Sequence, residues 1–386
     1  MKMLNELLKD VMNLGIITAD DVKRLTAIEL MMLIIERTNG LLNHVEIIDG
    51  QLANLLEIIR TTTLEQLHKW YQDGTLEELI NQSTLKLATK ENGINMYLYK
   101  NTTKTHVDEQ LNDISRCGFN AIYICVYHEV SNNVFTPYIS KQLIEYIITT
   151  AKAHGIEHIS LKLHIDGGTK LVPTDIDGFF NSWRTMVVDY ANLSKQHQLE
   201  SIYISNEMSK LTRGYADKWT PIINYVKALG LKVGVCYQGL FHCYKSDING
   251  LIDIIAVNIY PALTTNGYDI THLEATNKIV EQVMDDLKEL KIRYPQKSLM
   301  VSEIGCTRNV DALSVPYGWN FPTENQSFEP QKIYYKAIFA TLCATPNLLD
   351  GVYFWSTDDK TKINSFTPFG NIGCEQIIIN HLKGGN

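Results

Sequence analysis

The stretch SIYISNEMS, residues 201–209, and the stretch MVSEIG, residues 300–305, follow one pattern. In each, a short, mostly apolar run leads within one or two polar residues to a glutamate, Glu207 in the first and Glu303 in the second. Apolar runs of this length are typical of strands that are buried on both faces of a parallel sheet. A carboxylate at the point where such a strand leaves the core costs free energy unless it is paired or used. The two stretches therefore predict parallel strands with functional groups at their carboxyl ends.

The same alternation of apolar strands and amphipathic helices continues from Gly93 to the end of the chain. The predicted strands are 94–99, 121–127, 159–165, 201–205, 232–237, 254–260, 299–303 and 351–355. Predicted helices lie between and after them, at 141–154, 179–197, 219–229, 272–294, 331–345 and 377–382. Eight strands with intervening helices are the count of a (β/α)8 TIM barrel, which takes about 250 residues.

The alternative fold is a doubly wound open sheet, which should have a glycine-rich turn after its first strand. Here Tyr99 is followed by KNTTKTH, which contains no glycine. The sequence therefore favours the barrel, with a domain over residues 91–386.

Residues 1–90 differ from the rest, because they contain no proline and have little strand character. A heptad repeat of apolar residues runs from Met31 to Ile59 and predicts a coiled coil, with three strands favoured. Its two seams are Met31, Thr38, Val45, Leu52 and Ile59, and Ile34, Leu41, Ile48 and Leu55. Further apolar residues, among them Leu42 and Ile47, leave open a single amphipathic helix packed on the barrel. Residues 1–90 are thus a separate helical, oligomerising region.

Composition excludes several classes of protein. The chain has 386 residues, 45 % of them apolar, and its 35 basic and 43 acidic residues give a net charge of −8, which argues against a nucleic-acid partner. Glu6, Lys9 and Asp10 interrupt what would be the apolar core of a signal peptide, and the run Leu30 to Ile35 is too short to cross a bilayer. The seven cysteines form no CxxC motif. We therefore expect buried thiols in a protein made in the cytoplasm, with no membrane insertion.

Chemistry in a TIM barrel is expected at the carboxyl ends of the strands. The polar and aromatic residues there are His164, Asp166, Asn206, Glu207, Tyr237, Gln238, Asn258, Tyr260, Glu303 and Trp355. Two glutamates that face each other across a barrel mouth are what glycosidic bond cleavage needs, since one donates a proton and the other attacks the sugar. The alternative is that each glutamate is an ordinary solvated residue.

This arrangement resembles clan A of the glycoside hydrolases, and within it glycoside hydrolase family 113, the β-mannanase-like barrels. The matching stretches are SLKLHID, the helix with Trp183, Tyr190 and Ala191, SIYISNEMS, Trp219 with Ile222 and Ile223, SEIG followed by Pro316, Trp319 and Gln331, and GVYFWS. The resemblance covers nearly all of 93–386, and it implies a retaining glycosidase that needs no metal or organic cofactor.

The resemblance also implies roles for individual residues. Glu207 would be the general acid/base and Glu303 the nucleophile. Asn206 would bond the hydroxyl next to the reacting carbon, Tyr260 would hold Glu303 ionised, and Trp355 would floor the subsite at the scissile bond. The cleft would also be lined by His164, Tyr237 and Asn258.

Further candidates for the site follow from their position in the sequence alone. Trp319 lies in the long loop from Cys306 to Glu329, where we expect a sugar-binding wall, with simple packing as the alternative. Asp358 and Asp359 follow the last strand and could contact substrate, but a solvated loop is favoured for them. His242 and Tyr244 are weaker candidates. His154 and His158 have ligand-like spacing but fall on the opposite face of the barrel, so no metal site is expected.

The segment WYQDGTLEELINQSTL, residues 70–85, with the heptads before it, resembles N-terminal parts of tail-fibre and tail-appendage proteins of bacteriophages. That resemblance implies a virion protein, a homo-trimer that attaches to other tail proteins through residues 1–90. Its barrel would cleave a polysaccharide of the host surface during adsorption, acting within the chain. The alternatives are a catalytically silent, lectin-like receptor-binding protein and a purely structural tail protein. The two glutamates favour the enzyme.

Overall fold

Eight parallel strands close into a barrel in the computed structural model, which describes residues 86–362 and 364–383. The strands are β1 (Glu91–Met96), β2 (Ala121–Ser131), β4 (His158–Ile165), β5 (Ser201–Asn206), β6 (Lys232–Gln238), β7 (Ile254–Asn258), β8 (Ser298–Ile304) and β9 (Gly351–Phe354). The first strand closes the ring, because β1 pairs in parallel with both β2 and β9. The predicted (β/α)8 barrel is thus confirmed, and the open-sheet alternative is wrong.

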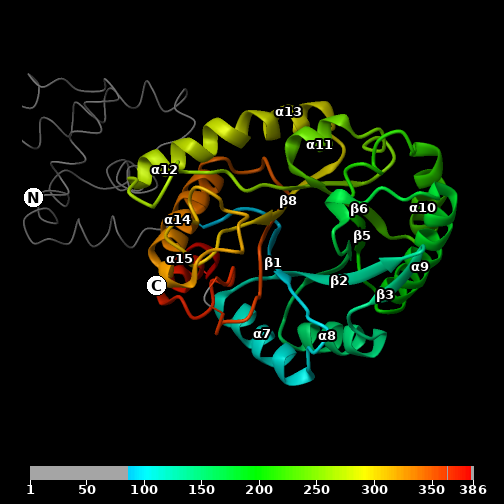
Figure 1. Cartoon of the computed structure of the whole chain (residues 1–386), viewed down its shortest axis with the longest axis horizontal. Coiled ribbons are helices and arrows are strands. Elements are labelled where there is room, and N and C mark those ends of the chain that lie inside the picture. Colours follow the sequence, from blue (N-terminus) through cyan, green and yellow to red (C-terminus); the bar gives the residue numbers. More distant parts are fainter. Residues whose placement is uncertain (1–85, 363, 384–386) are drawn as a thin grey trace, which may run out of the picture.

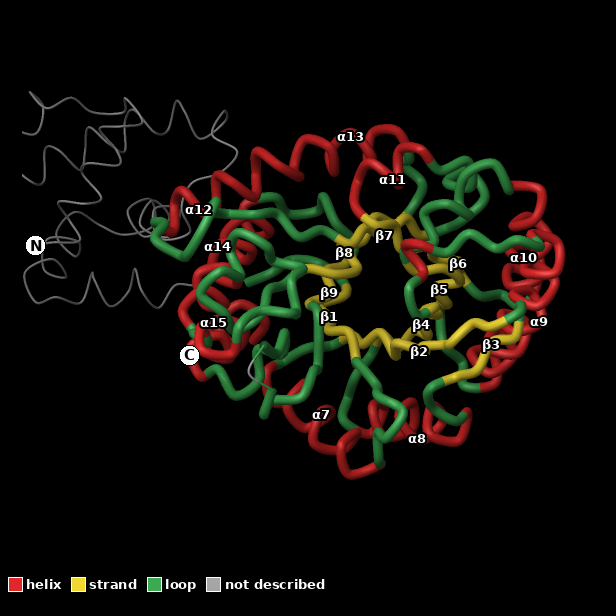
Figure 2. Tube along the Cα trace, viewed as in Figure 1, coloured by secondary structure: helices red, strands yellow, loops and turns green. Residues whose placement is uncertain are grey.

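Helices surround this ring of strands, as Figures 1 and 2 show in a view close to the barrel axis. They are α7 (Lys104–Cys117), α8 (Lys141–Ala153), α9 (Ile176–Gln196), α10 (Ala216–Ala228), α11 (Gly239–Lys245), α12 (His272–Ile279), α13 (Asp285–Arg293), α14 (Glu329–Ala344) and α15 (Ile372–Lys383). The expected helix 272–294 contains a π-helical stretch, Val280–Met284, between α12 and α13. Short 3₁₀ turns lie at Gly168–Lys170 and Thr323–Asn325.

Local sequence sets where several of these helices begin. Ser140 and Asp175 accept hydrogen bonds from the backbone N–H groups at the starts of α8 and α9. Thr271 and Glu274 form a reciprocal capping box at α12. Such caps satisfy N–H groups that have no partner inside a helix, so each of these helices starts at a defined residue.

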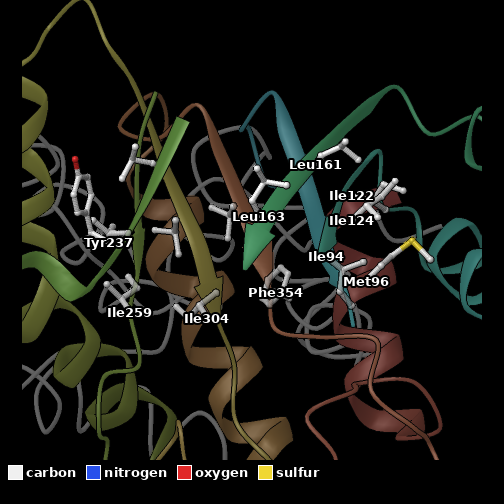
Figure 3. Close-up of a cluster of buried hydrophobic side chains, with 14 of the residues drawn as sticks. Ile94, Met96, Ile122, Ile124, Leu161, Leu163, Tyr237, Ile259, Ile304 and Phe354 are labelled. Atoms are coloured by element: carbon white, nitrogen blue, oxygen red, sulfur yellow. The ribbon is translucent and has the colours of Figure 1, made fainter. Parts of the chain in front are cut away.

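Apolar side chains on the outer side of the strands pack against the helices and form the main core. Figure 3 shows part of it, with buried side chains of β1, β2, β4 and β9 such as Ile94, Ile122, Leu163 and Phe354. These side chains alternate along each strand with those that point inward, as the period of two for a strand requires.

A layer of aromatic rings fills the barrel interior below the mouth. The rings of Tyr123 and Tyr353 are stacked with their centroids 3.4 Å apart, and the hydroxyls of Tyr123 and Tyr203 are 2.6 Å apart. Gly93 and Gly234 face the rings of Tyr353 and Tyr203, and a Cβ at either glycine would collide with the ring. The interior is therefore a packed floor, and only the mouth above it is open to a ligand.

The second barrel strand is longer than the sequence indicated and carries a feature that was not predicted. β2 runs on to Ser131 and turns back through Asn132 and Asn133, which have φ angles of 48° and 60°, into the antiparallel strand β3 (Val134–Pro137). Two positive φ angles in a two-residue loop are typical of a hairpin turn. This hairpin extends the barrel wall beside the mouth.

Some expectations concern residues outside those that the structure describes. The coiled coil and the region 1–90 fall almost entirely in this part of the chain, so the heptad stays a prediction. All seven cysteines lie in the described part of the chain, and none of them forms a disulfide there. Among the described residues, no helix is long and apolar enough to span a bilayer.

Candidate active site

A cavity of about 1410 Å³ opens at the carboxyl ends of the barrel strands. Its walls bring together nearly all of the residues that the sequence singled out. These are His164 from β4, Asn206 and Glu207 from the end of β5, Asn258 and Tyr260 from β7 and the residues after it, Glu303 from β8, Trp319 from the following loop, and Trp355 after β9.

Glu207 directly follows β5 and has a left-handed backbone conformation, with φ at 53°. The pairing of β5 with β6 shifts register just before it, and the Glu207 N–H donates to the carbonyl of Cys236 at 2.9 Å. A glutamate rarely adopts this conformation unless the surroundings hold it there, and such strain is concentrated at functional sites. The bent strand end is what delivers the Glu207 side chain to the cavity.

The environment of Glu207 favours its protonated form. Burial and the nearby charge of Glu303 raise the pKa of Glu207 from 4.5 to about 7. Two neighbours act in the opposite direction: Asn258 Nδ2 donates to Glu207 Oε1 at 2.9 Å, and Lys162 contributes a positive charge. A carboxyl group that titrates near neutral pH can both donate and accept a proton.

Glu303 has surroundings of the opposite kind. Its side chain is buried, Lys162 Nζ forms an ion pair with Oε1, and the Tyr260 hydroxyl donates to Oε2 at 2.8 Å. A positive charge and a hydroxyl donor both stabilise the carboxylate. The cavity thus holds one carboxyl whose pKa is raised and one that has a positive charge beside it.

A chain of hydrogen bonds links Glu207 to the strands on either side. Ser302 Oγ donates to Asn258 Oδ1 at 2.7 Å, which orients the Asn258 amide so that its Nδ2 donates to both Glu207 and Asn206 Oδ1. Asn206 Nδ2 in turn lies 3.2 Å from His164 Nδ1. Each amide is therefore fixed in one orientation by its neighbours.

His164 is neutral in this arrangement. Burial and the charge of Lys162, with a smaller effect of His128, hold its pKa well below 6.5. Because Nδ1 faces the Asn206 amide donor, the ring proton belongs on Nε2, and Nε2 is a buried polar atom without a hydrogen-bond partner among the described residues. A ligand that offers an acceptor to Nε2 would satisfy it.

Aromatic rings form one wall of the cavity. Tyr97 lies at its centre, with ring centroids 5.1 Å from Tyr127, 5.8 Å from Trp355 and 4.7 Å from Tyr99. Trp319 also lines the cavity, and 72 % of its surface is exposed. Aromatic faces of this kind suit ligands with a flat apolar side and polar edges.

The loops after β8 and β9 are fastened to each other behind this cavity. Arg308 is buried, and its guanidinium donates to the carbonyls of Lys360 at 3.0 Å, of Thr367 at 2.9 Å and of Phe369. Gln331 Nε2 donates to the carbonyls of Cys306 and Phe366, at 3.1 and 3.0 Å. The two loops therefore form a single wall.

The model of Glycoside Hydrolase Family 113 matches residues 141–366. The chain belongs to glycoside hydrolase family 113. No curated protein matches it.

Solved structures of other proteins have a barrel similar to that of this family 113 protein. A GH113 β-1,4-mannanase has a TM-score of 0.63 at 15 % identity, covering 76 % of this chain and 99 % of its own. The β-mannanase AaManA from Alicyclobacillus acidocaldarius, in complex with ManMIm, has a TM-score of 0.61 at 16 % identity, covering 78 % and 98 %. A β-glucuronidase from an uncultured Clostridium species has a TM-score of 0.56 at 13 % identity, covering 76 % of this chain and 50 % of its own.

Tyr237 is the one predicted site residue of this glycoside hydrolase that does not line the cavity. Its ring lies among the side chains between strands and helices, as Figure 3 shows, and its hydroxyl donates to Asn249 Oδ1 at 2.7 Å. The neighbouring Gln238 lines the cavity instead. The expected cleft role of Tyr237 is therefore wrong, because successive strand residues face opposite sides.

The second correction concerns Asp358, which was expected in a solvated loop. Asp358 lines the cavity, accepts from the Tyr99 hydroxyl, and lies 3.3 Å from Lys362 Nζ. The weaker candidates His242 and Tyr244 are not part of the cavity wall.

The sequence did not predict Lys162 or the tyrosine wall, which is formed by Tyr97, Tyr99 and Tyr127. A lysine inside the apolar run SLKLHI was the available signal for Lys162, because a charged residue there has to face a partner. His154 and His158 lie at the end of α8 and the start of β4, on the face opposite the cavity. Across the residues that the structure describes, no group of three or more His, Cys, Asp or Glu side chains could hold a metal ion.

Proposed function

We propose that this family 113 barrel is a retaining glycosidase that cleaves within polysaccharide chains, with Glu303 as nucleophile and Glu207 as general acid/base. The observation that carries the proposal is the contrast between the two carboxyls. Glu303 has the charge of Lys162 beside it, whereas the pKa of Glu207 is raised to about 7. Opposite environments for two carboxyls in one site are the pattern of an acid and a nucleophile.

In the first step, Glu207 gives its proton to the glycosidic oxygen while a Glu303 oxygen attacks the anomeric carbon. The bond from that carbon to the leaving oxygen breaks, and the leaving sugar departs with the proton. The result is a glycosyl ester on Glu303 and an ionised Glu207. The hydrogen bond from Asn258 orients the Glu207 carboxyl throughout.

In the second step, Glu207 accepts a proton from water, and the water oxygen attacks the anomeric carbon. The ester bond breaks, its electron pair returns to Glu303, and Glu207 is again protonated. Two displacements at one carbon leave its configuration unchanged. Tyr260, which donates to Glu303 at 2.8 Å, stabilises the carboxylate as it re-forms.

The cavity supports a polymeric substrate. Its volume of about 1410 Å³ exceeds the roughly 300–1,000 Å³ of a site for one small molecule. Exposed Trp319 and the tyrosine wall provide flat faces on which successive sugars can stack. Since two structures similar to this barrel are named β-mannanases, β-1,4-mannan is the first polymer to test.

The decisive experiment measures reducing ends released from β-1,4-mannan and from purified bacterial surface polysaccharides. We expect Glu303→Gln to abolish release on every substrate. Glu207→Gln should retain part of the activity on aryl glycosides, because a good leaving group needs little protonation. Azide should then yield a glycosyl azide of retained configuration with the Glu207 variant. Glu281→Gln, at an exposed glutamate on the outer helix layer, is the matched control.

Two results would contradict the assignment. Wild-type activity in Glu303→Gln would refute the assignment of Glu303 as nucleophile. A product of inverted configuration would refute the retaining mechanism. A wild-type protein that binds a polysaccharide tightly yet releases no reducing ends from it would instead be the lectin-like alternative.

The proposal extends to where the enzyme acts. We place it on a bacteriophage tail as a homo-trimer, attached to other tail proteins through residues 1–90 and directed at host surface polysaccharide. The support is the heptad from Met31 to Ile59 and the likeness of residues 70–85 to tail-fibre proteins.

Light scattering of the full chain tests this assembly. Aspartate at Ile48 and Leu55 would put charges into the apolar seam, so the double variant should be a monomer. An unchanged trimer in the double variant, or a monomeric wild type, would refute the coiled coil.

A further inference from the structure

Lys162 is a charged residue in the middle of β4, and its side chain is fully buried. Its Nζ lies inside the barrel, 5.7 Å from the centroid of the Tyr123 ring below and 5.5 Å from that of Trp355. It is not among the residues that line the cavity. Lys162 therefore lies beneath the site and does not reach the substrate.

The surroundings of Lys162 are built to hold its charge in one place. Its Nζ forms an ion pair with Glu303 Oε1 and donates to Asn95 Oδ1 at 3.1 Å. The Asn95 amide is fixed from its other side, because Nδ2 donates to the carbonyls of Ser302 at 2.9 Å and Phe354 at 3.1 Å. These bonds tie the ammonium to both strands that flank the mouth at β8 and β9.

The charges of Lys162 and Glu303 neutralise each other in the apolar interior of the barrel. A buried ammonium without a counter-charge is unstable, and so is a buried carboxylate. Among the described residues, Glu303 is the carboxylate that forms an ion pair with Lys162, and Lys162 is the cation that does so with Glu303. Removing either partner therefore leaves the other uncompensated.

We propose that Lys162 is a positioning residue of the reaction, which acts through Glu303 and never touches substrate. Its charge stabilises the Glu303 carboxylate and its Nζ fixes Oε1, while Tyr260 fixes Oε2. Its charge also opposes the effect of Glu303 on the pKa of Glu207. This inference rests on the proposed function, since it requires Glu303 to react as an anion.

The test is the variant Lys162→Met, which keeps the length of the side chain and removes its charge. Without the ammonium, the Glu303 carboxylate loses its opposite charge, so the acidic limb of kcat/KM should move to higher pH. The loss of an opposite charge displaces such a limb by about 1–3 pH units. On that limb the loss of activity is about 10- to 1,000-fold.

The basic limb should move in the same direction, because Lys162 also lowers the pKa of Glu207. A variant that only loosens the barrel would lower the whole profile without moving either limb. Hydrolysis of β-1,4-mannan and of an aryl β-mannobioside provides the two profiles. Lys227→Met is the matched control, since it removes a lysine paired with Asp253 at 2.8 Å on the opposite face of the barrel.

A second measurement needs no substrate and covers the case in which Lys162→Met folds poorly. The double variant Lys162→Met/Glu303→Gln removes both charges, so it should melt at a higher temperature than Lys162→Met alone. This difference should be largest at alkaline pH and vanish at acid pH, because only a charged carboxylate lacks its partner. A difference that is absent, or that does not change with pH, overturns the inference.

The failure of the inference and the failure of the proposed function give different results. If Glu303→Gln is inactive while the limbs of Lys162→Met coincide with those of the wild type, the proposed function stands and the role of Lys162 is refuted. If Glu303→Gln is active, the proposed function fails first.

Discussion

The raised pKa of Glu207 predicts that this carboxyl destabilises the folded protein in alkaline solution. The carboxyl titrates near 4.5 in an unfolded chain and near 7 in the barrel. Below 4.5 the group is protonated in both states and has no effect on the free energy of unfolding. Between these two values only the folded state keeps the proton, so stability falls as the pH rises, and the full loss is present above about pH 7.

The size of the effect follows from the shift. Moving a carboxyl pKa from 4.5 to about 7 corresponds to about 3 kcal/mol. The variant Glu207→Gln removes this penalty and keeps an oxygen that can accept from Asn258. Unfolding entropies of about 2 cal/mol/K per residue convert about 3 kcal/mol into about 5 °C for a barrel of this size.

Thermal unfolding of the wild type and of Glu207→Gln across the pH range is the assay. The variant should melt at about the same temperature as the wild type at pH 4.5 and about 5 °C higher above about pH 8. A constant difference across the range would show that Glu207 does not carry a perturbed carboxyl. The same raised pKa predicts that kcat/KM declines above about pH 7, because the general acid is then ionised.

Three further substitutions separate the roles of the aromatic residues. Tyr260→Phe removes the 2.8 Å bond to Glu303 and should lower kcat/KM about 10- to 100-fold with the fold intact by circular dichroism; an unchanged kcat/KM would exclude that bond from the reaction. Trp319→Ala removes an exposed stacking surface and should raise KM for polymer with kcat unchanged, so an equal loss in kcat would contradict a binding role. Tyr237→Phe removes the hydrogen bond to Asn249 and should lower the free energy of unfolding by about 1 kcal/mol without altering kcat or KM. A changed KM would contradict the placement of Tyr237 outside the cavity.

The parallel strands were predictable because each contains a short apolar run. β4, β5 and β8 are buried nearly from end to end, so the apolar run indicates where each strand lies. The hairpin was missed for the opposite reason. β3 is short and mostly exposed, and its residues Val134–Pro137 show no apolar alternation. Its only signal is the Asn132-Asn133 pair, which favours a tight turn.

The side chains of the site depended on strand parity, which apolar runs do not reveal. Tyr237 and Gln238 are adjacent at the end of β6, so only one of them can face the mouth. A tyrosine is the better sugar-binding side chain of the two, yet Tyr237 packs in the core between the strands and the helices. The same parity could have identified Lys162, because it lies two residues before His164 and thus shares its inward face.

The bonded loops after β8 and β9 have a consequence for how such a barrel can change during evolution. Arg308 belongs to one loop, and the carbonyls that it satisfies belong to the other. A graft of residues 356–371 alone onto a related barrel would leave those carbonyls without their donor. New substrate preference therefore has to be inherited, or engineered, by exchanging both loops as one module, while the strand ends with Glu207 and Glu303 remain as they are.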